Sequence, residues 1–174
     1  MRTITVALGE KTYNIEIAAG LLDQIGAKAR VLSQAVKAAI ISDSNVDPLY
    51  GERLERSLAA SGFEVTRIVF AAGEQSKNLT VLGQVYDELA RAGLTRSDLI
   101  LTLGGGVPGD LGGFAAATFL RGIDFIQVPT SLLAQIDSSV GGKVAIDLPS
   151  GKNLAGSFYQ PKAVFIDPDL LKTL

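Results

Sequence analysis

Apolar and polar residues alternate at the start of the chain, and the alternation predicts a pair of strands. In residues 4–8 and again in residues 13–17, a large apolar residue occupies every second position. That period is typical of a strand with one buried face. The segment 9–11 between them begins with a glycine and indicates a turn. We therefore expect an N-terminal strand pair.

The rest of the chain alternates between segments with helical and with strand-like periodicity. Helices are expected over residues 21–32, 48–60, 79–92, 107–120 and 132–138, and strands over residues 36–42, 63–70, 99–103, 125–128 and 163–166. Such alternation requires crossover connections between strands. It predicts one α/β domain over residues 1–174, doubly wound and Rossmann-like, whose mostly parallel sheet carries helices on both faces.

The composition narrows the class of protein. The chain has 174 residues, of which 47% are hydrophobic and 20% charged, a balance typical of a compact globular domain. The formal net charge of -2 gives no positive field that would attract nucleic acid or an anionic membrane. Cysteine is absent, and Glu10 interrupts the N-terminus before any signal-like apolar run develops. We expect a soluble, cytoplasmic protein.

The chain contains no histidine. This removes the commonest general base, the commonest metal ligand and every Ser-His or Cys-His arrangement. Any chemistry has to use lysines, carboxylates or a bound cofactor.

A glycine-rich segment carries the strongest chemical signal. The apolar strand 99–103 runs into Gly104, and Gly106 and Gly109 complete the G-x-G-x-x-G spacing ahead of a helix. In this context glycine lets the backbone approach a diphosphate, and the helix N-terminus attracts its charge. The acidic residue expected at the end of the next strand is missing, because Asp124 precedes that strand. A dinucleotide site and a simple tight turn both remain open.

Polar residues follow two other predicted strands. Asp43 and Asn45 stand where ligands of open α/β sheets bind and are suited to ribose hydroxyls, although helix capping explains them as well. Glu74 and Lys77 lie in a glycine-containing segment that is either part of a site or a solvated loop.

Two lysines stand beside glycine-rich turns in the last third of the chain. Lys143 follows a segment rich in hydroxyl groups, and Lys152 precedes Asn153. Such a cluster is suited to a phosphate ester, although surface lysines are commonly just solvated. Arg121, at the end of the helix after the glycines, is suited either to phosphate or to the helix dipole.

At this level of detail the chain resembles the 3-dehydroquinate synthases. Residues 104–122 are similar to the glycine-rich signature of that family, and the similarity continues through residues 127–143, 151–153, 158–162 and 171–174. One departure is Pro108, which stands where the family usually has an aliphatic residue and removes an amide hydrogen from the loop.

The resemblance implies an activity and a set of site residues. The family belongs to the shikimate pathway, and its NAD transiently oxidises a ring hydroxyl so that phosphate can leave; the hydride then returns, and an aldol step closes the carbocycle. The substrate, 3-deoxy-D-arabino-heptulosonate 7-phosphate, would contact Asp137, Lys143, Lys152 and Asn153, with Arg121 near its phosphate across a dimer interface. The NAD site would consist of Asp43, Asn45, Glu74, Lys77, Gly105, Gly106, Val107, Asp110, Thr130, Ser131, Leu133, Leu170, Lys172 and Thr173.

The resemblance also implies components that this sequence does not supply. The family holds divalent zinc or cobalt with one glutamate and two histidines of a following helical domain. We therefore expect a C-terminal metal-binding domain outside this chain, a homodimer in the full-length enzyme and no turnover by residues 1–174 alone. Two alternatives remain. One is an NAD-binding domain of the glycerol or iron-dependent alcohol dehydrogenase type, which Gly151-Lys152-Asn153 disfavours, and the other is a non-catalytic nucleotide-binding module.

Overall fold

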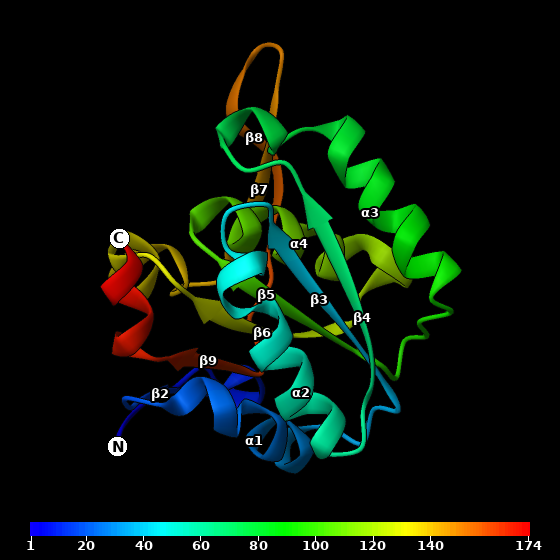
Figure 1. Ribbon diagram of the computed structural model, residues 1–174. Helices are drawn as coiled ribbons and strands as arrows, with labels where there is room; N and C mark the ends of the chain where they lie inside the picture. Colours follow the sequence, from blue (N-terminus) through cyan, green and yellow to red (C-terminus); the bar gives the residue numbers. More distant parts are fainter.

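The computed structural model describes residues 1–174 and is built on a seven-stranded sheet (Figure 1). The strand order is β1-β2-β9-β6-β5-β3-β4. The strands are β1 (Arg2–Val6), β2 (Tyr13–Ile17), β3 (Lys37–Asp43), β4 (Glu64–Phe70), β5 (Leu99–Gly104), β6 (Asp124–Pro129) and β9 (Ala163–Ile166). The α-helices are α1 (Ile25–Leu32), α2 (Glu52–Ala60), α3 (Leu79–Arg91) and α4 (Gly106–Thr118).

The sheet is parallel except at one edge. β1 pairs antiparallel with β2, and every other pairing in this sheet is parallel. The chain leaves β3 toward β4 on one side and leaves β5 toward β6 on the other. The carboxyl ends of β3 and β5 therefore form the topological switch point, where open α/β sheets bind their ligands. The predicted doubly wound sheet with an N-terminal strand pair is confirmed.

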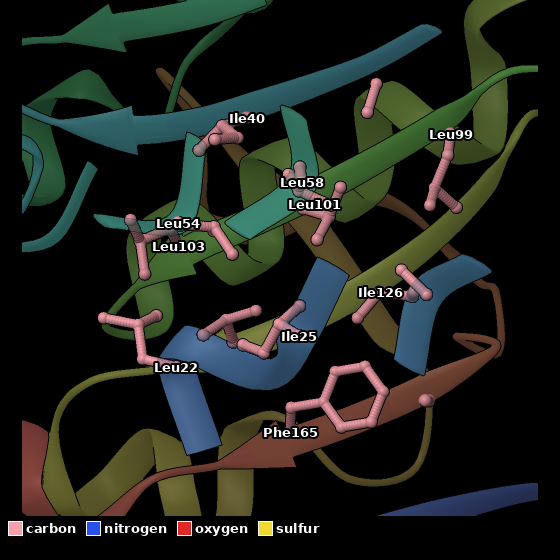
Figure 2. Close-up of a cluster of buried hydrophobic side chains, with 14 of the residues drawn as sticks. Leu22, Ile25, Ile40, Leu54, Leu58, Leu99, Leu101, Leu103, Ile126 and Phe165 are labelled. Atoms are coloured by element: carbon pink, nitrogen blue, oxygen red, sulfur yellow. The ribbon is translucent and has the colours of Figure 1, made fainter. Parts of the chain in front are cut away.

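Helices cover both faces of the sheet, because the central strands present apolar side chains on each face. Ala38 and Ile40 of β3 belong to one core cluster with α1 and α2, whereas Ala39 and Ile41 belong to a second with α3 and α4. Figure 2 shows the first cluster, in which Leu54 and other helix residues pack onto the sheet. A fully buried leucine such as Leu54 stabilises the folded state by about 1.5–3 kcal/mol relative to an exposed one.

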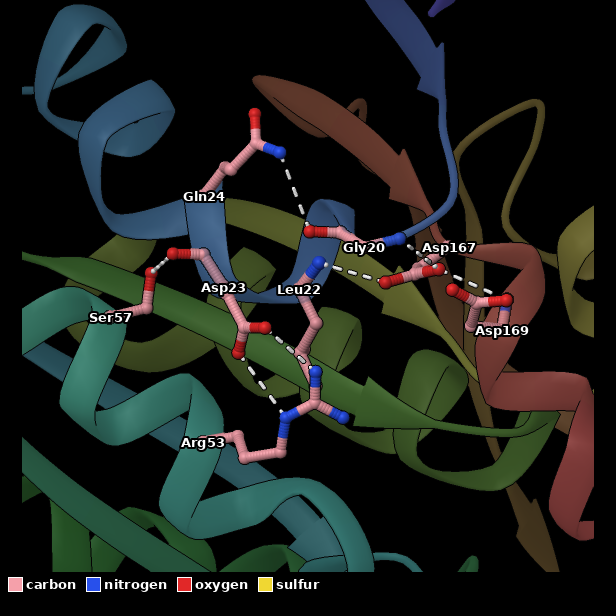
Figure 3. Close-up of polar contacts among 8 residues, drawn as sticks. All are labelled: Gly20, Leu22, Asp23, Gln24, Arg53, Ser57, Asp167 and Asp169. Atoms are coloured by element: carbon pink, nitrogen blue, oxygen red, sulfur yellow. Dashed lines mark hydrogen bonds and ion pairs between the residues drawn. The ribbon is translucent and has the colours of Figure 1, made fainter.

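A single buried carboxylate ties the end of the chain to its beginning. Asp167, which is 1% exposed, directly follows β9. Its oxygens accept hydrogen bonds from the N–H groups of Gly20 at 3.1 Å, Leu22 at 3.0 Å and Asp169 at 3.0 Å (Figure 3). It thereby positions the turn before α1 and caps the 3-10 helix Pro168–Thr173. No sequence motif marks Asp167.

Three of the expected helices contain irregular turns. The helix expected over residues 48–60 begins as a π-helical turn, Asp47–Gly51. The helix expected over residues 21–32 begins as a 3-10 turn, Leu21–Gln24, entered through Gly20 at φ 72°. The helix expected over residues 132–138 is present, with its last five residues, Ala134–Ser138, in a π-helical turn. None of the helices has the length and apolarity needed to cross a membrane.

The larger difference is a second, two-stranded sheet. Lys143 and the segment 151–153, expected beside glycine-rich turns, lie within strands β7 (Lys143–Leu148) and β8 (Gly151–Phe158), which pair antiparallel. β7 packs on α4: a Cβ added at Gly113 would lie 2.4 Å from Cγ1 of Val144. The turns themselves are present, since Gly141 and Gly142 have positive φ before Lys143 and a turn at residues 149–150 precedes Gly151. The strands were not predicted, because their pairing and their packing against α4 have no local sequence signal.

Candidate functional site

The glycine loop brings the N-terminus of α4 to the switch point. Gly104 ends β5 at φ 156°, where a Cβ would come within 2.5 Å of Cγ of Pro108. Glycine is therefore needed for this turn. Gly105, the N-cap residue of α4, provides no side-chain cap, so first-turn N–H groups are left for an anion. Pro108 lies in that turn, is buried and has no N–H to offer.

The loop lies close to the segment that follows β6. A Cβ added at Gly105 would lie 3.4 Å from Oγ of Ser131, and one added at Gly106 would lie 3.6 Å from Oγ of Ser138. The N–H of Thr130 donates to the carbonyl of Gly104 at 2.9 Å, which holds the two loops together. The gap between the two loops is narrow and is lined by hydroxyl groups. A side chain at Gly105 or Gly106 would fill it.

Asp43 orders the loop after β3 with one carboxylate oxygen and leaves the other oxygen free. Its Oδ1 accepts hydrogen bonds from the N–H groups of Asn45 at 2.9 Å and Val46 at 3.0 Å, which form an Asx turn ahead of the helical turn Asp47–Gly51 and do not cap it. Its Oδ2 has no hydrogen-bond partner in the protein, and the residue is only 8% exposed. One oxygen therefore orders the loop while the other is free for a ligand. Asn45 itself is exposed.

Lys77 connects the glycine loop to the β7–β8 hairpin. Its residue is 4% exposed, which excludes the solvated-loop interpretation for this side chain. Its Nζ lies 2.5 Å from Oδ2 of Asp110, in the second turn of α4, and 2.5 Å from Oδ1 of Asn153 in β8. Exposed Glu74 pairs with Lys152 at 3.2 Å and links the same loop to β8. Such an exposed ion pair contributes only about 0–1 kcal/mol to the stability of the fold.

The environment of Asp110 raises the pKa of its carboxyl above the ordinary value. Burial raises the pKa of the Asp110 carboxyl above its usual value, and the hydrogen bond and charge of Lys77 oppose that rise without cancelling it. Negative charge on Glu74 and Asp147 adds to the rise. Lys77 is thus the main group that stabilises a carboxylate at this position.

A pocket of about 510 Å³ adjoins this group. It brings together four of the residues expected from the sequence: Asp110, Asp137, Lys143 and Asn153. The side chains of Asp137 and Lys143 are exposed and have no ion-pair or hydrogen-bond partner in the protein, so both can contact a ligand. Its apolar wall includes Phe158, whose side chain is exposed. The arrangement suits a small polar molecule that carries an anionic group.

Other expected residues lie outside this pocket. Arg121 follows α4, at the opposite end of that helix from the glycine loop, and its exposed side chain has no partner. It is presented by a turn in which Leu120 has φ 52° and Arg121 has φ 68°, conformations that are strained for residues other than glycine. Lys152 is bound to Glu74 and does not line the pocket either.

The remaining expected cofactor residues vary in what they can offer. Leu170 is a core residue, 1% exposed, whose carbonyl accepts from the Tyr50 hydroxyl at 3.0 Å, so it is not an open contact surface. Lys172 is exposed and pairs with Asp169 at 2.7 Å. The Thr173 hydroxyl lies 2.7 Å from that of Tyr50. Val107 is half-buried, and Leu133, 64% exposed, stands free.

Two residues of the site were missed by the sequence analysis. Ser138 faces Gly106 and lines the pocket, and Asp147 accepts a hydrogen bond from the N–H of Asn153 at 2.8 Å. The sequence pattern that could have indicated Asp147 is a carboxylate between the apolar residues Ile146 and Leu148 in an alternating segment.

Comparison with known proteins identifies the family. Residues 67–174 match the family described as 3-dehydroquinate synthase N-terminal. The chain belongs to the 3-dehydroquinate synthase family. It is 58% identical over 174 residues to the 3-dehydroquinate synthase of Clostridium acetobutylicum, covering all of this chain and 49% of the relative. It is 53% identical over 171 residues to that of Enterococcus faecalis V583, covering 98% and 48%. The chain thus spans about half the length of the curated relatives it matches.

Solved structures share the fold. A 2-deoxy-scyllo-inosose synthase complexed with carbaglucose-6-phosphate, NAD+ and Co2+ matches with a TM-score of 0.90 and 30% identity, over 98% of this chain and 47% of that one. The 2-epi-5-epi-valiolone synthase of Streptomyces hygroscopicus, with NAD+ and Zn2+ bound, matches with a TM-score of 0.84 and 31% identity, over 97% and 46%. A Red Sea brine pool alcohol dehydrogenase, 17% identical with a TM-score of 0.79 over 100% and 47%, shares the fold alone.

The metal implied for 3-dehydroquinate synthases does not fit the residues of this chain. No group of three or more histidine, cysteine, aspartate or glutamate side chains is placed to hold a metal ion. The buried polar group at the site consists of Lys77, Asp110 and Asn153, and it contains one carboxylate and a cation. That donor set suits an ion pair and not a divalent metal.

Proposed function

We propose that this chain is the NAD-binding half of a 3-dehydroquinate synthase, a lyase that converts 3-deoxy-D-arabino-heptulosonate 7-phosphate to 3-dehydroquinate and phosphate. The observation that carries the proposal is the contact of Lys77 with both Asp110 on the glycine-loop helix and Asn153 on the pocket wall. The Lys77 side chain thus lies between the dinucleotide loop and a pocket suited to an anionic substrate. The named relatives and the cofactor-bound structures support this assignment.

In this proposal the cofactor occupies the switch point. The N–H groups of Gly105, Gly106 and Val107 face the diphosphate, and Asp43 uses its free oxygen for a ribose hydroxyl. Ser131 and Thr130 wall the loop on its other side. The further cofactor residues are Asn45, Glu74, Lys77, Asp110, Leu133, Leu170, Lys172 and Thr173, with Leu170 limited to its backbone. When bound, NAD supplies the hydride acceptor.

The residues of this chain would then bind and orient the sugar phosphate. Lys143 and Asp137, both free of partners, supply a cation for anionic groups and a carboxylate for hydroxyls, and Asn153 contributes its amide group. Lys152 lies close by and adds positive charge. Lysine ammonium groups stabilise the charge that develops on departing phosphate. Arg121, which does not line this pocket, would serve the phosphate site of a second subunit in a homodimer.

Turnover would require a second, metal-binding domain, since the donors for zinc or cobalt are not present in this chain. We propose that the complete enzyme acts in the cytoplasm and that residues 1–174 alone bind NAD without turnover. The match to the alcohol dehydrogenase, at 17% identity, gives no support for net alcohol oxidation.

Calorimetric titration of NAD into the chain tests the proposal. Saturable binding is expected, and Asp110→Ala should weaken it at least tenfold because a charged hydrogen-bonding group contributes about 1.5–3 kcal/mol. The matched control is Asp87→Ala, an exposed α3 carboxylate without a partner, which should bind NAD like the unsubstituted chain. Absence of binding by a folded sample would contradict the assignment of the cofactor half to this chain.

A further inference from the structure

The hairpin that carries Asn153 has an irregular register. Ile146 pairs with Ala155, but Leu148 pairs with Gly151, so β8 contains four steps where β7 contains two. The extra residues of β8 form a bulge that includes Asn153, opposite Asp147 on β7. Bulges of this kind re-aim side chains and are common beside active sites. In Figure 1 the hairpin projects from the body of the molecule beside the turn that precedes α3.

Asp147 uses the bulge to join the hairpin to the Lys77 loop. Its own N–H donates to the carbonyl oxygen of Lys77 at 2.8 Å, and its Oδ1 accepts from the N–H of Asn153 at 2.8 Å. Asn153 Oδ1 in turn accepts from Lys77 Nζ at 2.5 Å. The three residues therefore form a closed ring of hydrogen bonds between two segments about seventy positions apart.

The ring holds Asn153 in an unfavourable backbone conformation. Asn153 has φ 56°, in the left-handed region, which asparagine tolerates better than most residues but which still has to be stabilised by its surroundings. The hydrogen bond to Asp147 stabilises that backbone from the β7 side. With the backbone so fixed, the amide oxygen of Asn153 points at Lys77.

We infer that Asp147 is a positioning residue, which sets the orientation of Asn153 and through it that of Lys77 at the boundary between cofactor and substrate. This inference rests on the proposed function. Asp147 does not line the 510 Å³ pocket, so it acts on a ligand there through its neighbours and not by contact. No other side chain accepts the Asn153 N–H, so removal of the Asp147 carboxylate leaves that N–H without its acceptor.

The test compares three substitutions in the intact chain. Asp147→Ala removes the acceptor, Asp147→Asn keeps an oxygen at the same place without the charge, and Asp87→Ala controls for loss of an exposed carboxylate. We expect Asp147→Ala to accelerate amide hydrogen exchange at Asn153 and to weaken NAD binding roughly five- to tenfold, the effect of one hydrogen bond. Asp147→Asn should restore binding to within about twofold.

A double-mutant cycle separates positioning from a general loss of structure. If Asp147 acts through Lys77, Asp147→Ala should weaken NAD binding little further once Lys77→Met is present. Additive effects, or an unchanged NAD affinity in Asp147→Ala, would overturn the inference while leaving the proposed function intact. Failure of the unsubstituted chain to bind NAD would overturn both. Should Asp147→Ala fail to fold, Asp147→Glu, which moves the carboxylate by one methylene, replaces it in the cycle.

Discussion

Replacing Lys77 by methionine should destabilise the fold, because it leaves two polar partners without a cation. The side chain of Lys77 is 5% exposed and that of Asp110 is 21% exposed. Breaking a fully buried ion pair from one side costs about 3–5 kcal/mol. Water reaches part of Asp110, and methionine fills much of the lysine volume, so we expect a loss of about 2–3 kcal/mol at neutral pH, or about 5–10 °C in Tm.

The pH dependence of this loss distinguishes an unpaired carboxylate from a packing defect. Burial already raises the pKa of Asp110 above its ordinary 3.8, and removal of Lys77 removes the interactions that oppose the rise. A carboxyl whose folded pKa exceeds its unfolded pKa contributes stability below the unfolded value and loses it as the pH rises through the folded value. The deficit of Lys77→Met should therefore be largest at neutral pH and should shrink as the pH falls toward the ordinary range of Asp110.

Denaturant unfolding of the chain at several pH values measures both effects. Asp110→Asn provides the matched variant: in the Lys77→Met background it should recover part of the lost stability, since no charge is then left unpaired. A Lys77→Met chain within about 0.5 kcal/mol of the unsubstituted one would refute the reasoning. So would a deficit that does not change with pH.

Two further predictions concern packing and a buried cap. Gly113→Ala should cost about 1–3 kcal/mol in thermal unfolding, because its Cβ would lie 2.4 Å from Cγ1 of Val144, whereas Gly83→Ala, with nothing within 4 Å of its Cβ, should be neutral or stabilising by up to about 1 kcal/mol. Equal effects would contradict the close contact of α4 with β7. Asp98→Ala should cost about 2–3 kcal/mol, since the 5%-exposed carboxylate accepts from Thr95 N–H and hydroxyl groups, both at 2.8 Å. Burial raises the pKa of Asp98, but its hydrogen bonds outweigh burial and lower the pKa on balance. The stabilisation by Asp98 should therefore be present above the ordinary pKa of 3.8 and be lost as the pH falls through the lowered value. Denaturant unfolding at a series of acid pH values checks this.

The periodicity of the chain predicted the large sheet well, because its strands and helices satisfy local rules. β5 and the middle of β3, residues 38–41, are almost wholly apolar and occur between helices, as buried parallel strands do. The glycines after β5 predicted the loop at the carboxyl edge, which the structure confirms at Gly104. In these cases the residues that determine the element are neighbours in the sequence.

The hairpin of β7 and β8 was not predicted, and the physical reason is its dependence on distant partners. β8 contains Gly151 and Gly156 together with several polar residues, which locally favour turns. Its strand form comes from pairing with β7, whose Val144 and Ile146 are buried against the second core cluster. No local pattern encodes that support.

For the site, the sequence by itself determined the chemical inventory: no histidine, a glycine loop before a helix, and lysines and carboxylates near strand ends. Only the tertiary structure decided which of these act together. It buried Lys77 between Asp110 and Asn153, and it placed Arg121 at the far end of α4. The reason is physical: periodicity reports which side of an element is buried, whereas the partner of a buried charge is chosen by the packing of segments far apart in the chain.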